Sequence, residues 1–243
     1  MQLSYEKIFK YSDIFNPLSL NTLLSAGKLA GLEPEKTLLD LGSGKGFPSL
    51  LWASVFGVHV EGFDLFKSYV DYANSRAKLL NLQGKAQYFC QDLKGYTFNK
   101  KYDVVAFLGL DVSIYGDRRK ALHCFKTLMK KDGVLIVAEP VWLKKPVPAH
   151  VIKALGVGED SFITLPEMQK LLHELGFQVL GHFVSSKEDW ELYVRPVYVA
   201  LNEIIKEKPA LAAETQGILD GFTAEYNSAG QYWNMALWVL KTH

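Results

Sequence analysis

The chain has 243 residues, of which 49% are hydrophobic, and its 27 lysines and arginines nearly balance 26 aspartates and glutamates. These values suit a folded domain with a sizeable core and argue against a strongly basic nucleic-acid-binding protein. Two cysteines give no disulfide framework, and six histidines show no paired ligand spacing, so we predict no metal. Because we find no apolar signal core and no membrane-length apolar run, we expect a cytoplasmic protein without a membrane partner.

Residues 1–34 are predicted to form a helical N-terminal preface. Apolar residues recur at helical spacing from Asn21 to Ala30, and Gly31 suits the end of that helix. An apolar strand, Leu38–Leu41, follows this preface.

A glycine-rich turn comes directly after that strand, with Gly42, Gly44 and Gly46 at alternate positions. Glycines allow a sharp turn and a close approach of the backbone to a ligand. The next apolar run ends at Asp64, where a second parallel strand presents a carboxylate to ribose hydroxyls in dinucleotide folds. Pro48 lacks a backbone N–H near a phosphate position, and Asp40 would repel pyrophosphate. The pattern therefore favours an adenosine cofactor without a phosphate and disfavours a nicotinamide oxidoreductase.

Helices and strands alternate through the middle of the chain. We predict helices at Ser68–Leu80, Arg118–Met129 and Pro166–Leu175, and strands near residues 86–89, 102–109, 131–140 and 177–184. A parallel sheet with helices on both faces accommodates this alternation. Residues 188–230 separate the last of these strands from a final one at 235–241. This segment reads as a helical insertion that serves as a lid or as an oligomer contact.

The stretch Leu38–Gly46 resembles motif I of the class I S-adenosylmethionine-dependent methyltransferases. Asp64-Leu65, Cys90-Gln91-Asp92-Leu93, Tyr102–Gly109 and Lys131–Pro140 resemble later strand ends of that family. The resemblance implies one α/β domain over residues 1–243, with a Rossmann-like, doubly wound, mostly parallel seven-stranded sheet. It also implies the cofactor S-adenosyl-L-methionine, with Asp64 holding the ribose and Asp92 reading the adenine. The implied cofactor-binding residues are Asp40, Gly42, Ser43, Gly44, Asp64, Leu65, Gln91, Asp92, Leu93 and Leu108.

A narrower resemblance extends outside this core. Asn16-Pro17-Leu18-Ser19, Glu139-Pro140 with Trp142, and Ser185-Ser186 with Asp189-Trp190 are similar to a bacterial methyltransferase subgroup without an assigned substrate. The methyl acceptor therefore stays open.

Candidates for chemistry beyond the cofactor are Glu139 and Tyr115 as catalytic residues, with Tyr11, Asn16, Asp111 and Trp142 as acceptor-binding residues. Each has a structural alternative, such as a loop cap for Glu139 or a core position for Trp142. A small-molecule methyltransferase, monomeric or homodimeric, is the favoured function. The alternatives are an RNA or DNA methyltransferase and a non-catalytic cofactor-binding scaffold.

Overall fold

A computed structural model describes residues 3–109 and 112–242, and its contacts divide the chain into two compact units. The sheet unit consists of Leu20–Glu139, Pro166–Phe183 and Ala236–His243. The helical unit consists of Met1–Ser19, Pro140–Leu165 and Val184–Met235. The predicted preface is divided between them, because the residues before Leu20 belong to the helical unit. That the chain forms a single domain stays a prediction.

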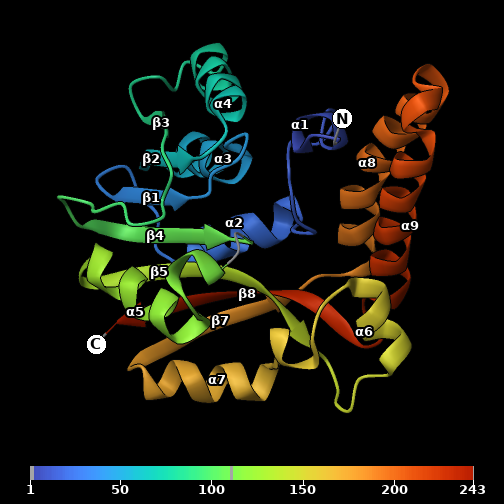
Figure 1. The fold of residues 1–243 in the computed structure, drawn as a ribbon. Coiled ribbons are helices and arrows are strands. Elements are labelled where there is room, and N and C mark those ends of the chain that lie inside the picture. The colour runs from blue at the N-terminus through green and yellow to red at the C-terminus, as the bar shows by residue number, and fades with distance from the viewer. Residues whose placement is uncertain (1–2, 110–111, 243) are drawn as a thin grey trace. The chain divides into compact units, whose positions relative to one another are not determined.

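The central sheet has the strand order β3-β2-β1-β4-β5-β8-β7, with β6 paired to β5 (Figure 1). Strands β1 to β5 pair in parallel. Leu143 N–H donates to Tyr232 O at one end of β5 and β8, and Thr242 Oγ1 donates to Gly133 O at the other, so β8 runs antiparallel to β5. The predicted mostly parallel α/β sheet is thus confirmed, with the two-residue β6 as an addition. The strands are β1 (Thr37–Leu41), β2 (His59–Asp64), β3 (Ala86–Cys90), β4 (Tyr102–Leu108), β5 (Met129–Trp142), β6 (Ile163–Thr164), β7 (Phe177–Val184) and β8 (Trp233–Thr242).

Helices cover both faces of the sheet, as the alternating pattern predicts. In the sheet unit, α5 (Arg118–Leu128) and α7 (Leu165–Glu174) lie on one face, and α2 (Leu20–Leu29), α3 (Phe47–Phe56) and α4 (Lys67–Leu79) lie on the other (Figure 1). The central strands β1 and β4 are buried almost throughout. Such continuous apolar runs are typical of parallel strands covered on both faces.

The connection from β3 to β4, residues 91–101, contains no helix. Aromatic side chains pack there instead: the ring of Phe63 on β2 lies 5.2 Å from that of Phe89 and 5.1 Å from that of Phe98. Tyr96 packs edge-on against Phe98 at 4.9 Å. This connection follows directly after Asp92, so the aromatic cluster anchors the segment that is predicted to hold the adenine.

The helical unit is built around two long helices, α8 (Lys187–Glu207) and α9 (Ala212–Ser228), which lie side by side (Figure 1). They confirm the predicted helical insertion before the last strand. Ser186 caps α8 through a reciprocal pair of hydrogen bonds with Asp189. The shorter helices of this unit are α1 (Tyr5–Ile8), α6 (Ala149–Leu155), η2 (Glu159–Ser161) and η3 (Pro209–Leu211), of which α6 was not predicted. The short helix η1 (Val112–Tyr115) belongs to the sheet unit.

Candidate functional site

The glycine-rich turn between β1 and α3 has the strained backbone that its glycines permit. Gly42, Gly44 and Gly46 have φ angles of 72°, 52° and 76°, in the left-handed region that residues with a Cβ rarely adopt. The N–H groups of Gly42 and Ser43 both donate to the carbonyl oxygen of Phe63, at 2.9 and 3.0 Å. The turn is thereby fixed to the end of β2.

Asp64 closes the turn from the neighbouring strand. Its Oδ2 accepts from Gly44 N–H at 2.8 Å, and its Oδ1 accepts from Phe66 N–H at 2.9 Å. Burial raises the pKa of this carboxyl, while the backbone N–H groups oppose the rise. Gln91 N–H donates to Asp64 O at 2.8 Å. The structure therefore brings together the predicted cofactor residues of three adjacent strand ends.

Asp40 lies inside β1, below the turn, and is only 2% exposed. Its Oδ2 accepts from Ser49 Oγ at 2.5 Å, and Ser49 Oγ lies 2.9 Å from the hydroxyl of Tyr88. Burial raises the pKa of Asp40 to about 7, with the nearby Asp64 adding to the rise and the Ser49 hydrogen bond opposing it. Sequence inspection did not find Ser49 or Tyr88, since a serine and a tyrosine 39 positions apart form no local motif.

The remaining predicted cofactor residues lie along the same edge of the sheet. Leu65 exposes 59% of its surface directly after β2, whereas Leu93 is buried. Asp92 is exposed, and its side chain accepts from Lys94 N–H at 2.9 Å. Leu108 ends β4, opposite Ala138 of β5. An exposed apolar side chain can pack on one face of a base, and an exposed carboxylate can accept a hydrogen bond from a base edge.

Glu139 on β5 forms a buried ion pair that sequence inspection did not predict. Arg118 Nε at the start of α5 donates to Glu139 Oε2 at 2.5 Å, and the two side chains are 14% and 4% exposed. Glu139 Oε1 is buried and has no hydrogen-bond partner in the described part of the chain. Burial raises the pKa of Glu139 although Arg118 opposes the rise. An arginine 21 residues before its partner carries no recognisable sequence signal.

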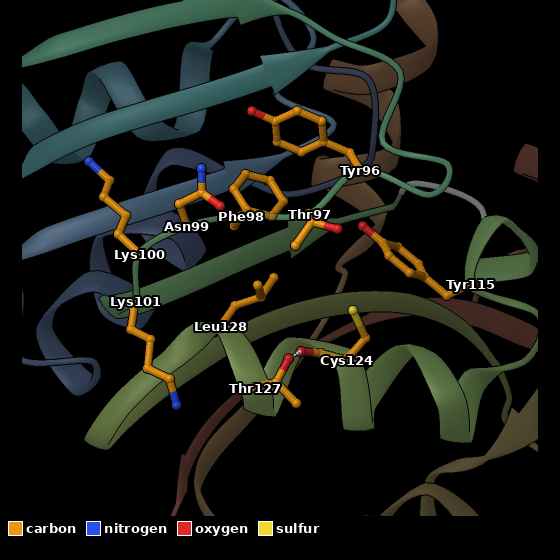
Figure 2. A pocket seen from close by; sticks show the side chains of 10 residues that line it. All are labelled: Tyr96, Thr97, Phe98, Asn99, Lys100, Lys101, Tyr115, Cys124, Thr127 and Leu128. Carbon is orange, nitrogen blue, oxygen red and sulfur yellow. Dashed lines mark hydrogen bonds between the residues drawn. The ribbon is translucent and has the colours of Figure 1, made fainter.

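Tyr115, the second predicted catalytic residue, packs its ring against Phe125 at 5.2 Å and Phe107 at 6.2 Å, and burial raises its pKa. It lines a cavity of about 350 Å³ between residues 96–101 and α5. Figure 2 shows its hydroxyl and the Cys124 sulfur directed into this cavity. None of the predicted cofactor residues lines this cavity.

Three predicted acceptor residues belong to the helical unit. Tyr11 is exposed and donates to Glu203, Asn16 is buried, and Trp142 is fully buried. Trp142 Nε1 donates to Glu159 O at 2.7 Å, and its ring packs 4.8 Å from that of Phe162. Trp142 is therefore a core residue, which was the alternative to the predicted acceptor-binding role. Asp111 lies outside the described residues.

Among residues 3–109 and 112–242, no cluster of three or more histidine, cysteine, aspartate or glutamate side chains is placed to hold a metal ion. No helix within those ranges combines the length and apolar character needed to cross a membrane.

Comparison with known proteins finds a matching domain model and similar proteins. Residues 38–133 match the family model described as "Methyltransferase domain". The uncharacterized protein YjhP of Escherichia coli K12 is 28% identical over 221 residues, which cover 88% of this chain and 89% of YjhP. The 27-O-demethylrifamycin SV methyltransferase of Amycolatopsis mediterranei is 25% identical over 184 residues, which cover 72% of this chain and 65% of that enzyme.

The fold is shared with solved methyltransferase structures. A SAM-dependent methyltransferase from Thiobacillus denitrificans, solved in complex with S-adenosyl-L-homocysteine, superposes with a TM-score of 0.90 at 24% identity, over 100% of both chains. Residues 38–133 therefore carry a methyltransferase domain, and the chain has the fold of solved S-adenosylmethionine-dependent methyltransferases.

Proposed function

We propose that this methyltransferase binds its cofactor over the glycine-rich turn and transfers the methyl group to a small-molecule acceptor. The observation that carries the proposal is the junction of the turn with Asp64, where Gly44 N–H and the carboxylate meet at 2.8 Å. This junction places a carboxylate beside backbone that a ligand can approach closely.

The residues present fit S-adenosyl-L-methionine. Ser43 in the turn has a buried Oγ without a hydrogen-bond partner among the described residues, which leaves it available to the amino acid portion of the cofactor. Asp40 would attract the ammonium group, Asp64 would accept from the ribose hydroxyls, and Asp92 would accept from the adenine amino group. Leu65, Leu93 and Leu108 would provide apolar contacts. Gly42 and Gln91 would contact the cofactor through their backbone atoms.

The reaction needs alignment of two partners and a place for one proton. When bound, S-adenosyl-L-methionine supplies an electrophilic methyl group on a positively charged sulfur. We assign Glu139 to accept the proton of an acceptor hydroxyl or amine, while Arg118 holds Oε2 and leaves Oε1 for that proton. A carboxyl with a raised pKa is a better base near neutral pH. The bound cofactor would supply the methyl carbon to the acceptor oxygen or nitrogen, and its sulfur would keep the electron pair of the broken carbon–sulfur bond.

Two observations favour a small acceptor over a nucleic acid. The positive and negative side chains nearly cancel over the chain, at 27 against 26. The Amycolatopsis relative is named for a small-molecule acceptor. Tyr115 stays a predicted catalytic residue, and Tyr11 and Asn16 stay predicted acceptor-binding residues.

Calorimetric titration with S-adenosyl-L-methionine, S-adenosyl-L-homocysteine and NADH tests the cofactor site. We expect binding of the two sulfur compounds and none of NADH; the reverse would refute the placement. The acceptor class is tested by incubating the enzyme and methyl-labelled cofactor with a cell extract. The products are then separated into low-mass, nucleic acid and protein fractions. Label in the low-mass fraction supports the proposal, and label confined to nucleic acid would overturn it.

A further inference from the structure

Three polar side chains form a chain beneath the glycine-rich turn. Asp40 comes from β1, Ser49 from α3 and Tyr88 from β3, and each is at most 4% exposed. Ser49 Oγ lies 2.5 Å from Asp40 Oδ2, 2.9 Å from the Tyr88 hydroxyl and 3.3 Å from Gly46 O. Buried hydroxyls seldom meet so closely unless each proton has a defined direction.

The number of available protons decides which of these groups donates. Ser49 has one hydroxyl proton, and its shortest contact is to Asp40, which as a carboxylate can only accept. The hydroxyl of Tyr88 must then donate, either to Ser49 Oγ at 2.9 Å or to Gly46 O at 3.3 Å. With Asp40 ionised, the shortest hydrogen bonds therefore run in one direction: the Tyr88 hydroxyl donates to Ser49 Oγ, and Ser49 Oγ donates to Asp40.

The ring of Tyr88 is held firmly in this place. A Cβ added to Gly62 would lie 2.3 Å from its Cδ1, and one added to Gly46 would lie 2.8 Å from its Cζ, so both glycines leave room for the ring. The side chain of Asn74 binds both backbone groups of Tyr88, accepting from N–H at 3.0 Å and donating to O at 2.9 Å. The hydroxyl is thus presented to Ser49 by a fixed ring.

We propose that Ser49 and Tyr88 are positioning residues that hold Asp40 as the carboxylate that receives the ammonium group of S-adenosyl-L-methionine. The inference rests on the proposed cofactor placement and adds two residues to it. A phenylalanine at position 88 would fill the same space, so the hydroxyl itself is the part that the role requires.

The charges around Asp40 make this role measurable. Asp64 on β2 is the charged group that acts on it and raises its pKa, β4 contributes Ala106 opposite it, and Lys45 of the turn lies 5.1 Å above the ring of Tyr72. Burial raises the pKa of Asp40 to about 7, Asp64 adds to the rise, and the Ser49 hydrogen bond opposes it. Loss of the hydrogen bond must therefore move the ionisation to higher pH.

The experiment is calorimetric titration of the full chain with S-adenosyl-L-homocysteine between pH 5.5 and 8.5. We expect the affinity to rise with pH, by about tenfold per unit below the midpoint, and to level off above it. The probe 5′-methylthioadenosine lacks the ammonium group, so its affinity should stay flat. Asp40→Asn should remove the rise for S-adenosyl-L-homocysteine.

The positioning residues are tested by Ser49→Ala and Tyr88→Phe. We expect the midpoint of the rise in affinity to lie about one pH unit higher in Ser49→Ala and about half a pH unit higher in Tyr88→Phe. At high pH both variants should recover the affinity of the natural chain. Tyr102→Phe is the matched control, because it removes a hydroxyl that donates to Glu61 at 2.6 Å. Urea unfolding of each variant identifies any loss of fold.

The outcomes separate the two proposals. If the natural chain does not bind S-adenosyl-L-homocysteine at any pH, the proposed cofactor site fails. If it binds, but Ser49→Ala and Tyr88→Phe keep the original midpoint, the positioning role is refuted and the cofactor site stands. An equal loss of affinity at every pH would mean that the two residues serve the fold alone.

Discussion

Replacing Gly62 by alanine should disturb the cofactor site through the ring of Tyr88. The new Cβ would lie 2.3 Å from Cδ1 and 2.5 Å from Cε1 of that ring, closer than real contacts allow. The ring is also held in place, because its hydroxyl lies 3.3 Å from Gly46 O and the Asn74 side chain binds its backbone. Overpacking of a filled core costs about 1–3 kcal/mol, and we expect the upper end here. Loss of unfolded-state freedom offsets up to ~1 kcal/mol of this, which leaves a net loss of about 2 kcal/mol.

Urea unfolding followed by circular dichroism measures this loss, and Gly84→Ala is the control. A Cβ at Gly84 would meet nothing within 4 Å, so that variant should be neutral or slightly more stable. Because the Cβ at Gly62 would also come within 3.0 Å of Ser43 Cβ, the affinity for S-adenosyl-L-homocysteine should fall as well. Equal stability and equal affinity in the two variants would show that the reasoning about Tyr88 is wrong.

Three further predictions concern charged groups. Asp64→Ala should weaken S-adenosyl-L-homocysteine binding by about 1–3 kcal/mol in calorimetry with the fold retained; unchanged affinity would remove Asp64 from the site. The pKa of Asp40 is about 7 in the folded chain, against 3.8 normally. Between these values the folded state holds a proton on Asp40 that the unfolded state has lost, so stability falls as the pH rises from about 4 to 7. Asp40→Asn should therefore be more stable than the natural chain at pH 8, by about 2–4 kcal/mol in urea unfolding, and equal stability would contradict the burial argument. Arg118→Met should lose about 3–5 kcal/mol of stability, because Glu139 would stay buried without its cation. Adding Glu139→Leu to that variant should recover most of the loss. Normal stability of Arg118→Met alone would mean that the ion pair is open to water.

The sheet and the glycine-rich turn could be predicted because their signals are local. Each parallel strand is one short apolar run, and the glycines stand in direct sequence with Asp40. Asp64 follows at the spacing that one strand–helix–strand unit imposes. Composition and spacing are sufficient for such features, since each depends on residues in one short stretch.

The supporting contacts could not be predicted, because they join distant elements. Ser49 and Tyr88 look like ordinary helix and strand residues, and only the register of β3 beside β2 brings them together beneath the turn. Arg118 looks like a solvated helix residue until β5 places Glu139 against it. Trp142 illustrates the opposite case, in which a residue beside a motif forms part of the core.

The position of β8 has a consequence for the order in which the sheet is completed during synthesis. This strand follows β7 in the chain, yet it lies between β5 and β7. Until its residues have left the ribosome, β5 presents an unpaired edge and β7 lacks its neighbour in the sheet. Unpaired edges are where nascent chains associate wrongly. The central part of the sheet is therefore completed only when the last strand of the chain is available to pair with both β5 and β7.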